Sequence, residues 1–339
     1  MAVTADERTG DSSTPEPATV PAPKAVAATT GGGVVTGVAR TALMVAAARA
    51  IESGRPDALA HDPYAGHFVR ASGGCDDWPL HPDDVPDGLE DPLWGHLGRY
   101  FGLRTRVFDD HLTRQAEAGI RQVVLLGAGL DTRAHRLPWP RDCTVYELDR
   151  EPVLAFKQRI LDAPVRPDTP PPTPRARRVP IAADLRLDWI DALCGAGFDP
   201  ERPTAWVVEG LLLYLPAAVE SRMIDTIDRF SVPGSSLAYE VKLGIEPATA
   251  RASPLYSTAL KRIGIDLVAL FDRDPRPDSA ALLTERGWRT ETHDPYDHTR
   301  RLGRGPLPEP SDALAGNRWT FAALTEDGRS AAQTRPTGD

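Results

Sequence analysis

Four acidic residues follow short apolar runs in the middle of the chain, and together they indicate a ligand site. Asp131, Asp149, Asp184 and Glu209 come at or just after the ends of four successive runs, the first of which is Val123–Leu126. In an open α/β sheet, ligands bind outside the carboxyl ends of the strands. We therefore expect the four carboxylates to converge on one crevice, where they would attract a cationic ligand.

The loop Gly127-Ala128-Gly129 follows the first run, where glycine lets the backbone turn tightly and approach a ligand. The third glycine of the dinucleotide fingerprint would fall at Thr132, and its absence disfavours a pyrophosphate. Asp131 would also repel an anion from the start of the next helix. The loop favours a phosphate-free nucleoside, and S-adenosylmethionine, whose demethylated product is S-adenosylhomocysteine, is such a ligand.

The second run carries Glu147 and Asp149 near its end, and an acidic side chain there accepts hydrogen bonds from ribose hydroxyls. Taken alone, Asp149 could instead cap a helix that begins near Pro152. A lone GxG turn is also weak support for a nucleotide site. The coincidence of all four acids with strand ends favours the site.

These acids need a parallel sheet to bring them together, and the chain predicts one. Short apolar runs alternate with amphipathic stretches, which indicates an α/β, doubly wound, mostly parallel Rossmann-like sheet of about seven strands. The strands are expected at Val123–Leu126, Cys143–Leu148, Val179–Ala182, Ala205–Val208, Ser236–Val241, Trp288–Glu291 and Trp319–Leu324. Helices are expected between them at Val153–Leu161, Trp189–Cys194 and Ala217–Phe230.

The sequence predicts a single domain over residues 33–324. It comprises an N-terminal helical part (33–118), a cofactor-binding core (119–245) and a less regular substrate or lid region (246–316). The first part should hold helices at Gly37–Ser53, capped by Thr36, and at Leu93–Ala118, ended by Gly119. By composition, residues 1–32 and 325–339 are expected to be flexible, and the proline-rich segment 163–180 to be an exposed loop.

The bulk properties exclude several classes of protein. No apolar stretch approaches the roughly 18–20 residues of a membrane span, and the N-terminus has no pattern of a secretory signal. Cys75, Cys143 and Cys194 form no CxxC pair, so a reduced cytoplasmic setting is expected and no zinc site. The net charge of −9 argues against nucleic acid as a partner. The oligomeric state is left open.

Several segments resemble the leucine carboxyl methyltransferase family and its bacterial relatives in natural-product pathways. These are VVLLGAGLDTRAHRL, VYELDREPVLAFK, AADLR and VVEGLLLYLPAAV, with GVARTALMVAAARA and HDPYAGHFV upstream. The resemblance runs from about Val35 to about Glu240 and more weakly through NRWTFAAL. It implies a class I methyltransferase fold and S-adenosylmethionine as cofactor.

The resemblance also implies roles for single residues. Those expected to hold the cofactor are Gly127 and Gly129 in the loop, Asp149 at the ribose, Asp184 and Leu185 beside adenine, and Glu209 facing the methionine moiety. Tyr214 matches a tyrosine near the transferring methyl group. Arg104 matches an arginine that binds the cofactor's carboxylate, with Arg106 as a competitor, and Arg40 takes the place of a basic residue in the N-terminal segment.

The acceptor implied by the family is a carboxylate, of a small molecule or a peptide. A carboxyl group with a pKa of about 4 is already an anionic nucleophile at neutral pH, so alignment rather than a general base is required. Arg104 or Arg106 would pair with a carboxylate, unless each forms an ordinary surface salt bridge. Tyr214 would donate a hydrogen bond to the acceptor or line the methyl channel, unless it is a core tyrosine.

Three alternatives stay open. Methylation of a phenolic or alcoholic hydroxyl would need a base, for which His67, His293 and His298 are candidates. An NAD-dependent oxidoreductase is disfavoured by the missing third glycine, and a non-catalytic binding module by the intact set of acids. The segment HDPYDH at His293 fits no established metal-ligand spacing, so no metal is expected.

Overall fold

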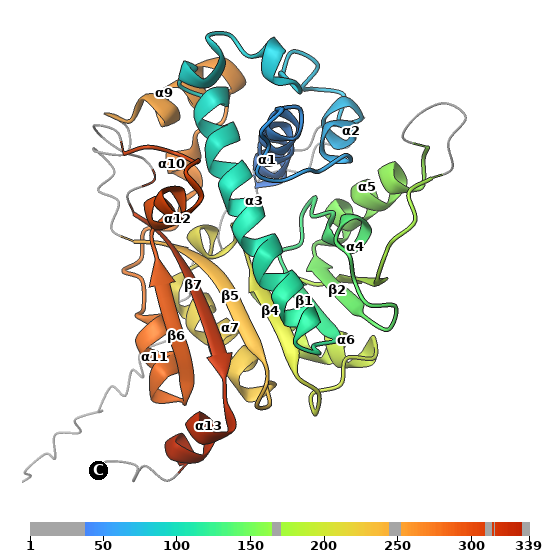
Figure 1. Cartoon of the computed structure of the whole chain (residues 1–339), viewed down its shortest axis with the longest axis vertical. Coiled ribbons are helices and arrows are strands. Elements are labelled where there is room, and N and C mark those ends of the chain that lie inside the picture. The colour runs from blue at the N-terminus through green and yellow to red at the C-terminus, as the bar shows by residue number, and fades with distance from the viewer. Residues whose placement is uncertain (1–37, 165–170, 244–251, 309–313, 315, 334–339) are drawn as a thin grey trace, which may run out of the picture. The chain divides into compact units, whose positions relative to one another are not determined.

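A seven-stranded mixed sheet is the centre of the structure (Figure 1). The computed structural model describes residues 38–164, 171–243, 252–308, 314 and 316–333, all within one unit that spans 33–339. The strand order is β3-β2-β1-β4-β5-β7-β6, with β7 antiparallel to both of its neighbours and the other pairs parallel. This order confirms the predicted fold class. The strands are β1 (Gln122–Leu126), β2 (Thr144–Asp149), β3 (Arg177–Ala182), β4 (Thr204–Val208), β5 (Ser236–Lys242), β6 (Trp288–His293) and β7 (Asn317–Leu324).

The central strands are apolar because both of their faces are covered. In β1, Val123 and Leu125 belong to one hydrophobic cluster, and Val124 and Leu126 belong to a second cluster on the other face. The first cluster joins the sheet to the N-terminal helices, and the second joins it to the helices between β3 and β6. A continuous apolar run is therefore what a buried parallel strand requires here.

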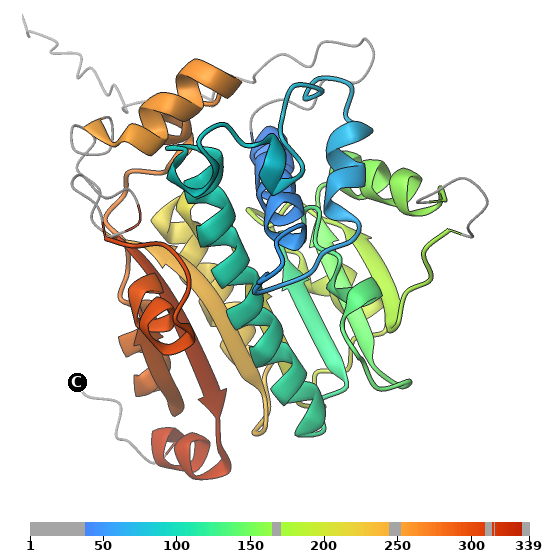
Figure 2. The same ribbon diagram turned by 45° about the horizontal axis from the view of Figure 1, so that its top comes forward.

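The helices lie on the two faces of the sheet. Figures 1 and 2 show α3 crossing the front with α1 beside it, and Figure 1 shows α7 and α11 behind the strands. The main helices of these two layers are α1 (Val38–Ser53), α2 (Ala65–Arg70), α3 (Trp94–Glu117), α4 (Arg133–Arg136), α5 (Glu151–Leu161), α6 (Ile190–Gly195) and α7 (Ala217–Arg229). The predicted helices are confirmed to within a few residues, and the expected cap, Thr36, lies outside the described residues.

Helix α1 packs closely on α3 because one residue of the contact has no side chain. A Cβ atom built on Gly102 would lie 2.5 Å from Cγ of Glu52, too close for any other residue without a shift. Glu52 is itself buried, and its carboxylate accepts the N–H of Leu59 at 2.7 Å. Gly102 thus sets the distance between the two helices.

The region predicted to be less regular contains several short helices. These are α9 (Pro254–Ile263), α10 (Leu267–Leu270), α11 (Ser279–Glu285) and α12 (Pro295–Leu302), with η1 (Pro82–Asp84), η2 (Gly88–Glu90) and η3 (Leu212–Tyr214) elsewhere. The HDPYDH segment begins α12: Asp294 is its N-cap and forms a capping box with Asp297. The acids of this segment are therefore engaged in starting a helix.

Two boundary predictions are wrong. The expected loop 163–180 ends early, because Arg177–Ala182 form β3, and Pro180 is tolerated there because β3 is an edge strand. Residues 325–339 were expected to be flexible, yet Glu326–Gln333 form α13. The reason is a docking contact: Arg329 pairs with Asp228 at 3.1 Å and donates to the backbone oxygens of Asp228 and Ser231.

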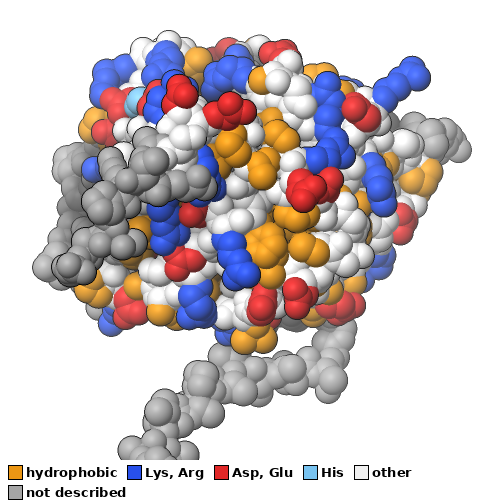
Figure 3. Space-filling view, turned by 90° about the horizontal axis from the view of Figure 1, so that it is seen from below, with side chains coloured by type: hydrophobic (Ala, Val, Ile, Leu, Met, Phe, Trp, Pro, Cys, Tyr) orange, Lys and Arg blue, Asp and Glu red, His pale blue; other side chains and the backbone are white. Residues whose placement is uncertain are grey.

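Charges of both signs cover the face seen from below, on the side away from α2 and α9 (Figure 3). Lys and Arg side chains are interspersed there with Asp and Glu and with apolar groups. Such a mixed surface differs from the basic patch that binds a phosphate backbone.

A buried ion pair fixes α5 against the edge of the sheet. Nζ of Lys157 lies 2.8 Å from Oε2 of Glu147, and both side chains are fully buried. Arg178 of β3 contacts the same carboxylate oxygen at 2.8 Å and also reaches Gln158. The three elements β2, β3 and α5 therefore meet at one carboxylate.

Removing Glu147 should destabilise the fold strongly, because the buried ammonium of Lys157 would lose its partner. We expect Glu147→Leu to lower the free energy of unfolding by about 3–5 kcal/mol. Adding Lys157→Met should restore only part of that loss, since it removes one of the two buried cations that lose their carboxylate and leaves Arg178 with Gln158 alone among the contacts described above. Urea unfolding measures both changes in the free energy of unfolding. If Glu147→Leu were as stable as the parent chain, the ion pair would not stabilise the fold as described.

Candidate active site

A cavity of about 340 Å³ opens at the carboxyl ends of the parallel strands, a volume in the usual range for small-molecule sites. It brings together most of the residues predicted from the sequence. Those that line it are Arg104, Gly127, Ala128, Gly129, Asp131, Asp149, Asp184, Leu185, Glu209 and Tyr214. The expected convergence of four acids on one crevice is therefore what the structure contains.

The glycine loop is held in place by β2. Gly127 and Gly129 have φ angles of 73° and 45°, in the left-handed region that favours glycine. The N–H groups of Gly127 and Ala128 both donate to the carbonyl of Leu148, at 2.9 and 3.0 Å. A Cβ atom on Gly127 would meet the side chain of Leu211 at 3.1 Å, so a larger residue would intrude on the cavity wall.

Asp149 faces the loop and does not cap a helix. Its Oδ2 accepts the N–H of Gly129 at 2.7 Å, and its Oδ1 accepts the N–H of Arg150 at 2.7 Å. The N-cap of α5 is Arg150, whose side chain makes no capping bond. A carboxylate has about four lone-pair sites, so Asp149 retains acceptors that can face a ribose.

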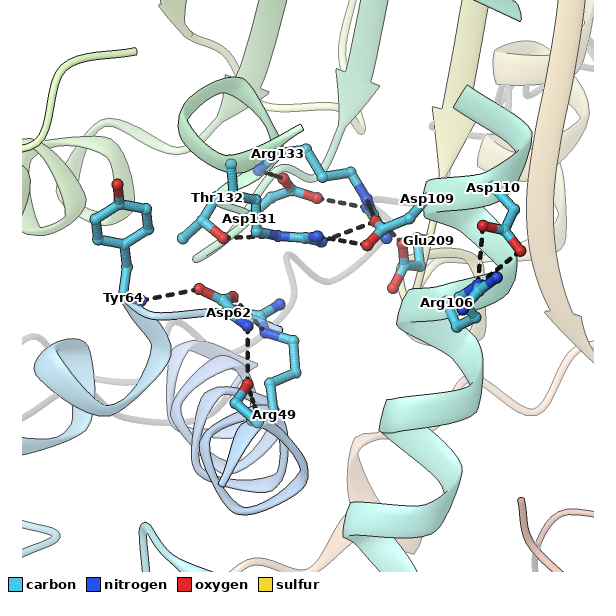
Figure 4. A network of polar contacts seen from close by, with 12 residues as sticks. Arg49, Asp62, Tyr64, Arg106, Asp109, Asp110, Asp131, Thr132, Arg133 and Glu209 are labelled. Carbon is cyan, nitrogen blue, oxygen red and sulfur yellow. Dashed lines mark hydrogen bonds and ion pairs between the residues drawn. The ribbon is translucent and has the colours of Figure 1, made fainter. Parts of the chain in front are cut away.

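Arg133 lines the cavity and is one of the residues that the sequence analysis did not predict. Its guanidinium is 3% exposed and contacts Asp109, Asp131 and Glu209 at 2.7, 2.5 and 2.7 Å (Figure 4). Burial would raise the pKa of the Asp131 carboxyl, but the charges of Arg133, Lys157 and Arg136 and the backbone N–H of Arg133 together outweigh it and lower that pKa to about 2. A signal was present, because Arg133 stands two residues after Asp131 in the quoted motif.

Arg104 makes a second buried pairing beside the first. It contacts Glu209 at 2.8 Å and Glu240 at 2.6 Å, while Tyr100 and Trp319 donate hydrogen bonds to Glu240. Burial would raise the pKa of Glu240, but Arg104 and these hydrogen bonds lower it. Glu240 was not predicted either, although a carboxylate inside the apolar run Ser236–Val241 is unusual enough to notice.

The two pairings leave a net negative charge under the cavity. Among the described residues, the cluster contains four carboxylates and three guanidinium groups, so the sum is one negative charge. Its members are Asp109, Asp131, Glu209 and Glu240 with Arg104, Arg133 and Arg136. Three carboxylates of this cluster also line the cavity, namely Asp131, Glu209 and Glu240, and they can face a cationic group such as a sulfonium.

Three predicted residues lie outside the cavity lining. Arg106 pairs with Asp110 at 2.8 Å on α3, apart from the central cluster in Figure 4. Glu147 is buried under α5 with Lys157. The guanidinium of Arg40 lies over the ring of Trp78, 5.7 Å from its centroid. The geometry therefore offers no support for a cofactor contact by Arg40, Arg106 or Glu147.

Two further lining residues have defined partners. Asp184 forms an ion pair with Arg186 at 2.5 Å, and the hydrogen bonds from Arg186 lower the pKa of Asp184. Tyr214 bonds to Thr41 and packs against Phe271, with ring centroids 6.0 Å apart. Burial raises the pKa of the Tyr214 phenol, so this group stays protonated at neutral pH.

None of the histidine candidates lines the cavity among the described residues. His298 is buried against Trp319 with ring centroids 5.3 Å apart, and burial lowers its pKa to about 4. His293 is the last residue of β6 and its ring meets that of His298 edge to face, and His67 lies in α2. In the described part of the chain, no group of three or more His, Cys, Asp or Glu side chains is placed to hold a metal ion.

The described geometry can be compared with known proteins. The model of a family described as leucine carboxyl methyltransferase matches residues 42–228, more than half of the chain. The chain belongs to this family. The predicted resemblance is thereby confirmed, with its segments inside the cofactor half of the sheet and the helices before it.

Two relatives carry the name of S-adenosyl-L-methionine-dependent methyltransferases. One, from Streptomyces coelicolor, is 60% identical over 291 residues, covering 86% of this chain and 94% of the relative. Another, from Mycobacterium sp. strain KMS, is 41% identical over 286 residues, covering 82% and 91%. A crystal structure of a DUF574 family protein from Streptomyces avermitilis covers 81% of this chain and 98% of its own, at 17% identity and a TM-score of 0.47. A likeness at that level carries no weight for function.

This member of the family depends on S-adenosylmethionine, and its residues fit that cofactor. The cradle at Gly127 would be filled by a Cβ atom, Asp149 has acceptors for ribose hydroxyls, and the buried charge cluster complements a sulfonium. In the described part of the chain, each helix is too short or too polar to cross a membrane.

The two neighbouring arginines of α3 should differ in their effect on cofactor binding. We expect Arg104→Lys to weaken S-adenosylmethionine binding by about tenfold, because an ammonium cannot span both Glu209 and Glu240 as a guanidinium does. Arg106→Lys is the matched control and should change affinity by less than about twofold, since Arg106 contacts only Asp110 in an exposed pair. Calorimetric titration with S-adenosylmethionine, S-adenosylhomocysteine and NAD measures this. A larger loss of affinity in Arg106→Lys than in Arg104→Lys would contradict the placement of Arg104 at the site. Binding of NAD without binding of S-adenosylmethionine would contradict the cofactor.

Proposed function

We propose that this methyltransferase transfers a methyl group to a carboxylate oxygen of a small organic acid or peptide, in natural-product biosynthesis. The observation that carries the proposal is that the described cavity wall offers no group suited to take a proton from an acceptor. Its described part contains no histidine, and three of its carboxylates, Asp131, Glu209 and Glu240, are held in ion pairs. An acceptor that is already anionic suits such a site.

The pKa values of the lining groups support this argument. A general base works best with a pKa near the operating pH. The pKa of Asp131 lies at about 2, and Arg104 together with the hydrogen bonds to Glu240 holds the pKa of Glu240 below its ordinary value despite its burial. At the other extreme, burial raises the pKa values of Tyr100 and Tyr214. These four groups keep one protonation state around neutral pH, whereas a carboxylic acid with a pKa of about 4 is ionised there.

The chain's own residues would divide the work of holding the two reactants. Asp149 and the loop at Gly129 would hold the ribose, with Asp184 and Leu185 beside the adenine. Glu209, fixed by Arg104 and Arg133, would face the methionine moiety. Tyr214 would remain protonated and donate a hydrogen bond toward the acceptor. Such orientation can contribute about 7–11 kcal/mol to the rate of a reaction between two bound groups.

The reaction needs no proton transfer. When bound, S-adenosylmethionine supplies a methyl group whose bond to sulfur breaks as the carboxylate oxygen bonds to its carbon, which leaves a methyl ester and S-adenosylhomocysteine. The protein's task is to exclude water and to align the attacking oxygen. The buried ion pairs beneath the cavity keep that alignment rigid, because each carboxylate is fixed by more than one contact.

The proposal predicts the acceptor type and the pH profile together. With a panel of carboxylic acids and phenols and methyl-labelled cofactor, we expect label in base-labile methyl esters from acids. For the best acid, kcat/KM should stay constant within about twofold between about pH 6 and 9, since the acceptor is ionised throughout that range. A profile that rises with pH through a single group, with label in phenol ethers, would favour hydroxyl methylation instead.

A matched control separates loss of the cofactor from loss of the acceptor. Asp149→Ala should abolish both ester formation and S-adenosylmethionine binding, because the ribose contact is lost. Asp110→Ala, at an exposed carboxylate on α3, should leave both unchanged. Ester formation that survived in Asp149→Ala would contradict the assignment of the site.

A further inference from the structure

Lys242 is the last residue of β5 and lines the same cavity, far from the residues assigned to the adenosine. Asp184 follows β3, and three strands, β2, β1 and β4, lie between β3 and β5. Neighbouring strands are about 4.8 Å apart, so the two ends of the cavity are separated by about 19 Å. Lys242 therefore belongs to the part of the cavity that remains for the acceptor.

The ammonium of Lys242 is fixed by groups from two other parts of the chain. Nζ donates to Oδ1 of Asn317, its register partner on β7, at 2.7 Å. It also lies 5.8 Å from the ring centroid of Tyr256 and 5.9 Å from that of Phe271. Both rings are within the range of cation–π attraction. An ammonium has three N–H donors, so the bond to Asn317 is compatible with a further bond to a ligand oxygen.

Aromatic and apolar side chains surround this ammonium. Tyr256 and Phe271 meet edge to face, with centroids 5.8 Å apart, and Phe271 also packs on Tyr214. Three leucines, Leu255, Leu267 and Leu314, add buried apolar surface to the lining of the cavity. A cation at the border of such a wall suits a ligand with one anionic group and a flat apolar body.

The other buried cations of the cavity have a different role. Arg104 and Arg133 each contact at least two carboxylates, which fixes them in the cluster beneath the methionine end. Lys242 instead lies at the other end of the cavity, where it contacts Asn317, Tyr256 and Phe271. Strand β4 lies beside β5, and Tyr214 follows β4. Lys242 therefore lies next to the place where methyl transfer is expected.

We propose that Lys242 binds the carboxylate of the acceptor, and that the acceptor is a carboxylic acid with an aromatic body packed against Tyr256 and Phe271. This rests on the proposed carboxylate methylation and names its substrate class. Asn317 would orient the ammonium, and the rings would select a planar group behind the carboxylate.

Binding of two matched probes to the protein loaded with S-adenosylhomocysteine tests the proposal without turnover. We expect 2-naphthoate to bind, and the uncharged 2-naphthamide to bind at least about tenfold more weakly. Lys242→Gln can keep the hydrogen bond to Asn317 but removes the charge. It should weaken 2-naphthoate by about tenfold, and change 2-naphthamide and S-adenosylhomocysteine by less than about twofold.

Two further variants separate charge from shape. Phe271→Leu should weaken both probes by a similar factor, because it removes a ring face and no charge. Lys261→Gln, on the exposed side of α9, is the matched control and should change neither. The role of Lys242 is overturned if 2-naphthoate does not bind, or if it binds equally to the parent chain and to Lys242→Gln. In either case, ester formation in the acid panel would still support carboxylate methylation. If 2-naphthoate binds to the parent chain and not to Lys242→Gln, but no acid of the panel yields an ester, the proposed carboxylate methylation is overturned and the binding role of Lys242 stands.

Discussion

Two buried guanidinium groups hold the site together, and the other features of the cavity depend on them. Arg133 follows the glycine loop, Arg104 comes from α3, and they meet at Glu209 after β4. A buried carboxylate without a partner is costly, so each arginine permits acids to lie at strand ends that would otherwise repel one another. Through these contacts helix α3 becomes part of the cavity wall and not merely a cover for the sheet.

Much of the fold was predictable because both faces of the sheet are covered. Burial on both sides produces the continuous apolar runs that mark β1 and β4, and the acids after them follow from the position of ligand sites in such sheets. The edges were harder. Pro180 is compatible with a strand only because β3 has one free side, and α13 depends on a salt bridge from Arg329 to Asp228 that no local pattern contains.

The site was predicted less completely, for two geometric reasons. Glu147 and Asp149 face the same side of β2, but Glu147 lies about 7 Å farther from the carboxyl end of the strand and is covered by α5. The alternation of side chains along a strand does not show which of the two is covered. The helical periodicity could have distinguished Arg104 from Arg106. Arg104 shares a helix face with Phe101 and Phe108, whereas Arg106, two residues further on, points in a different direction. The acceptor end was beyond prediction, since Lys242 meets Tyr256 and Phe271 only through the tertiary fold.

The hydrogen bonds of the glycine loop have a thermodynamic consequence. Gly127, Ala128 and Gly129 donate their N–H groups to Leu148 and Asp149, so the conformation of the loop is fixed by the chain itself. Glycine has more conformational entropy to lose than any other residue, and here that loss occurs during folding. A ligand that enters such a preorganised loop gives up less of its binding energy to ordering the protein, so more of it remains as affinity.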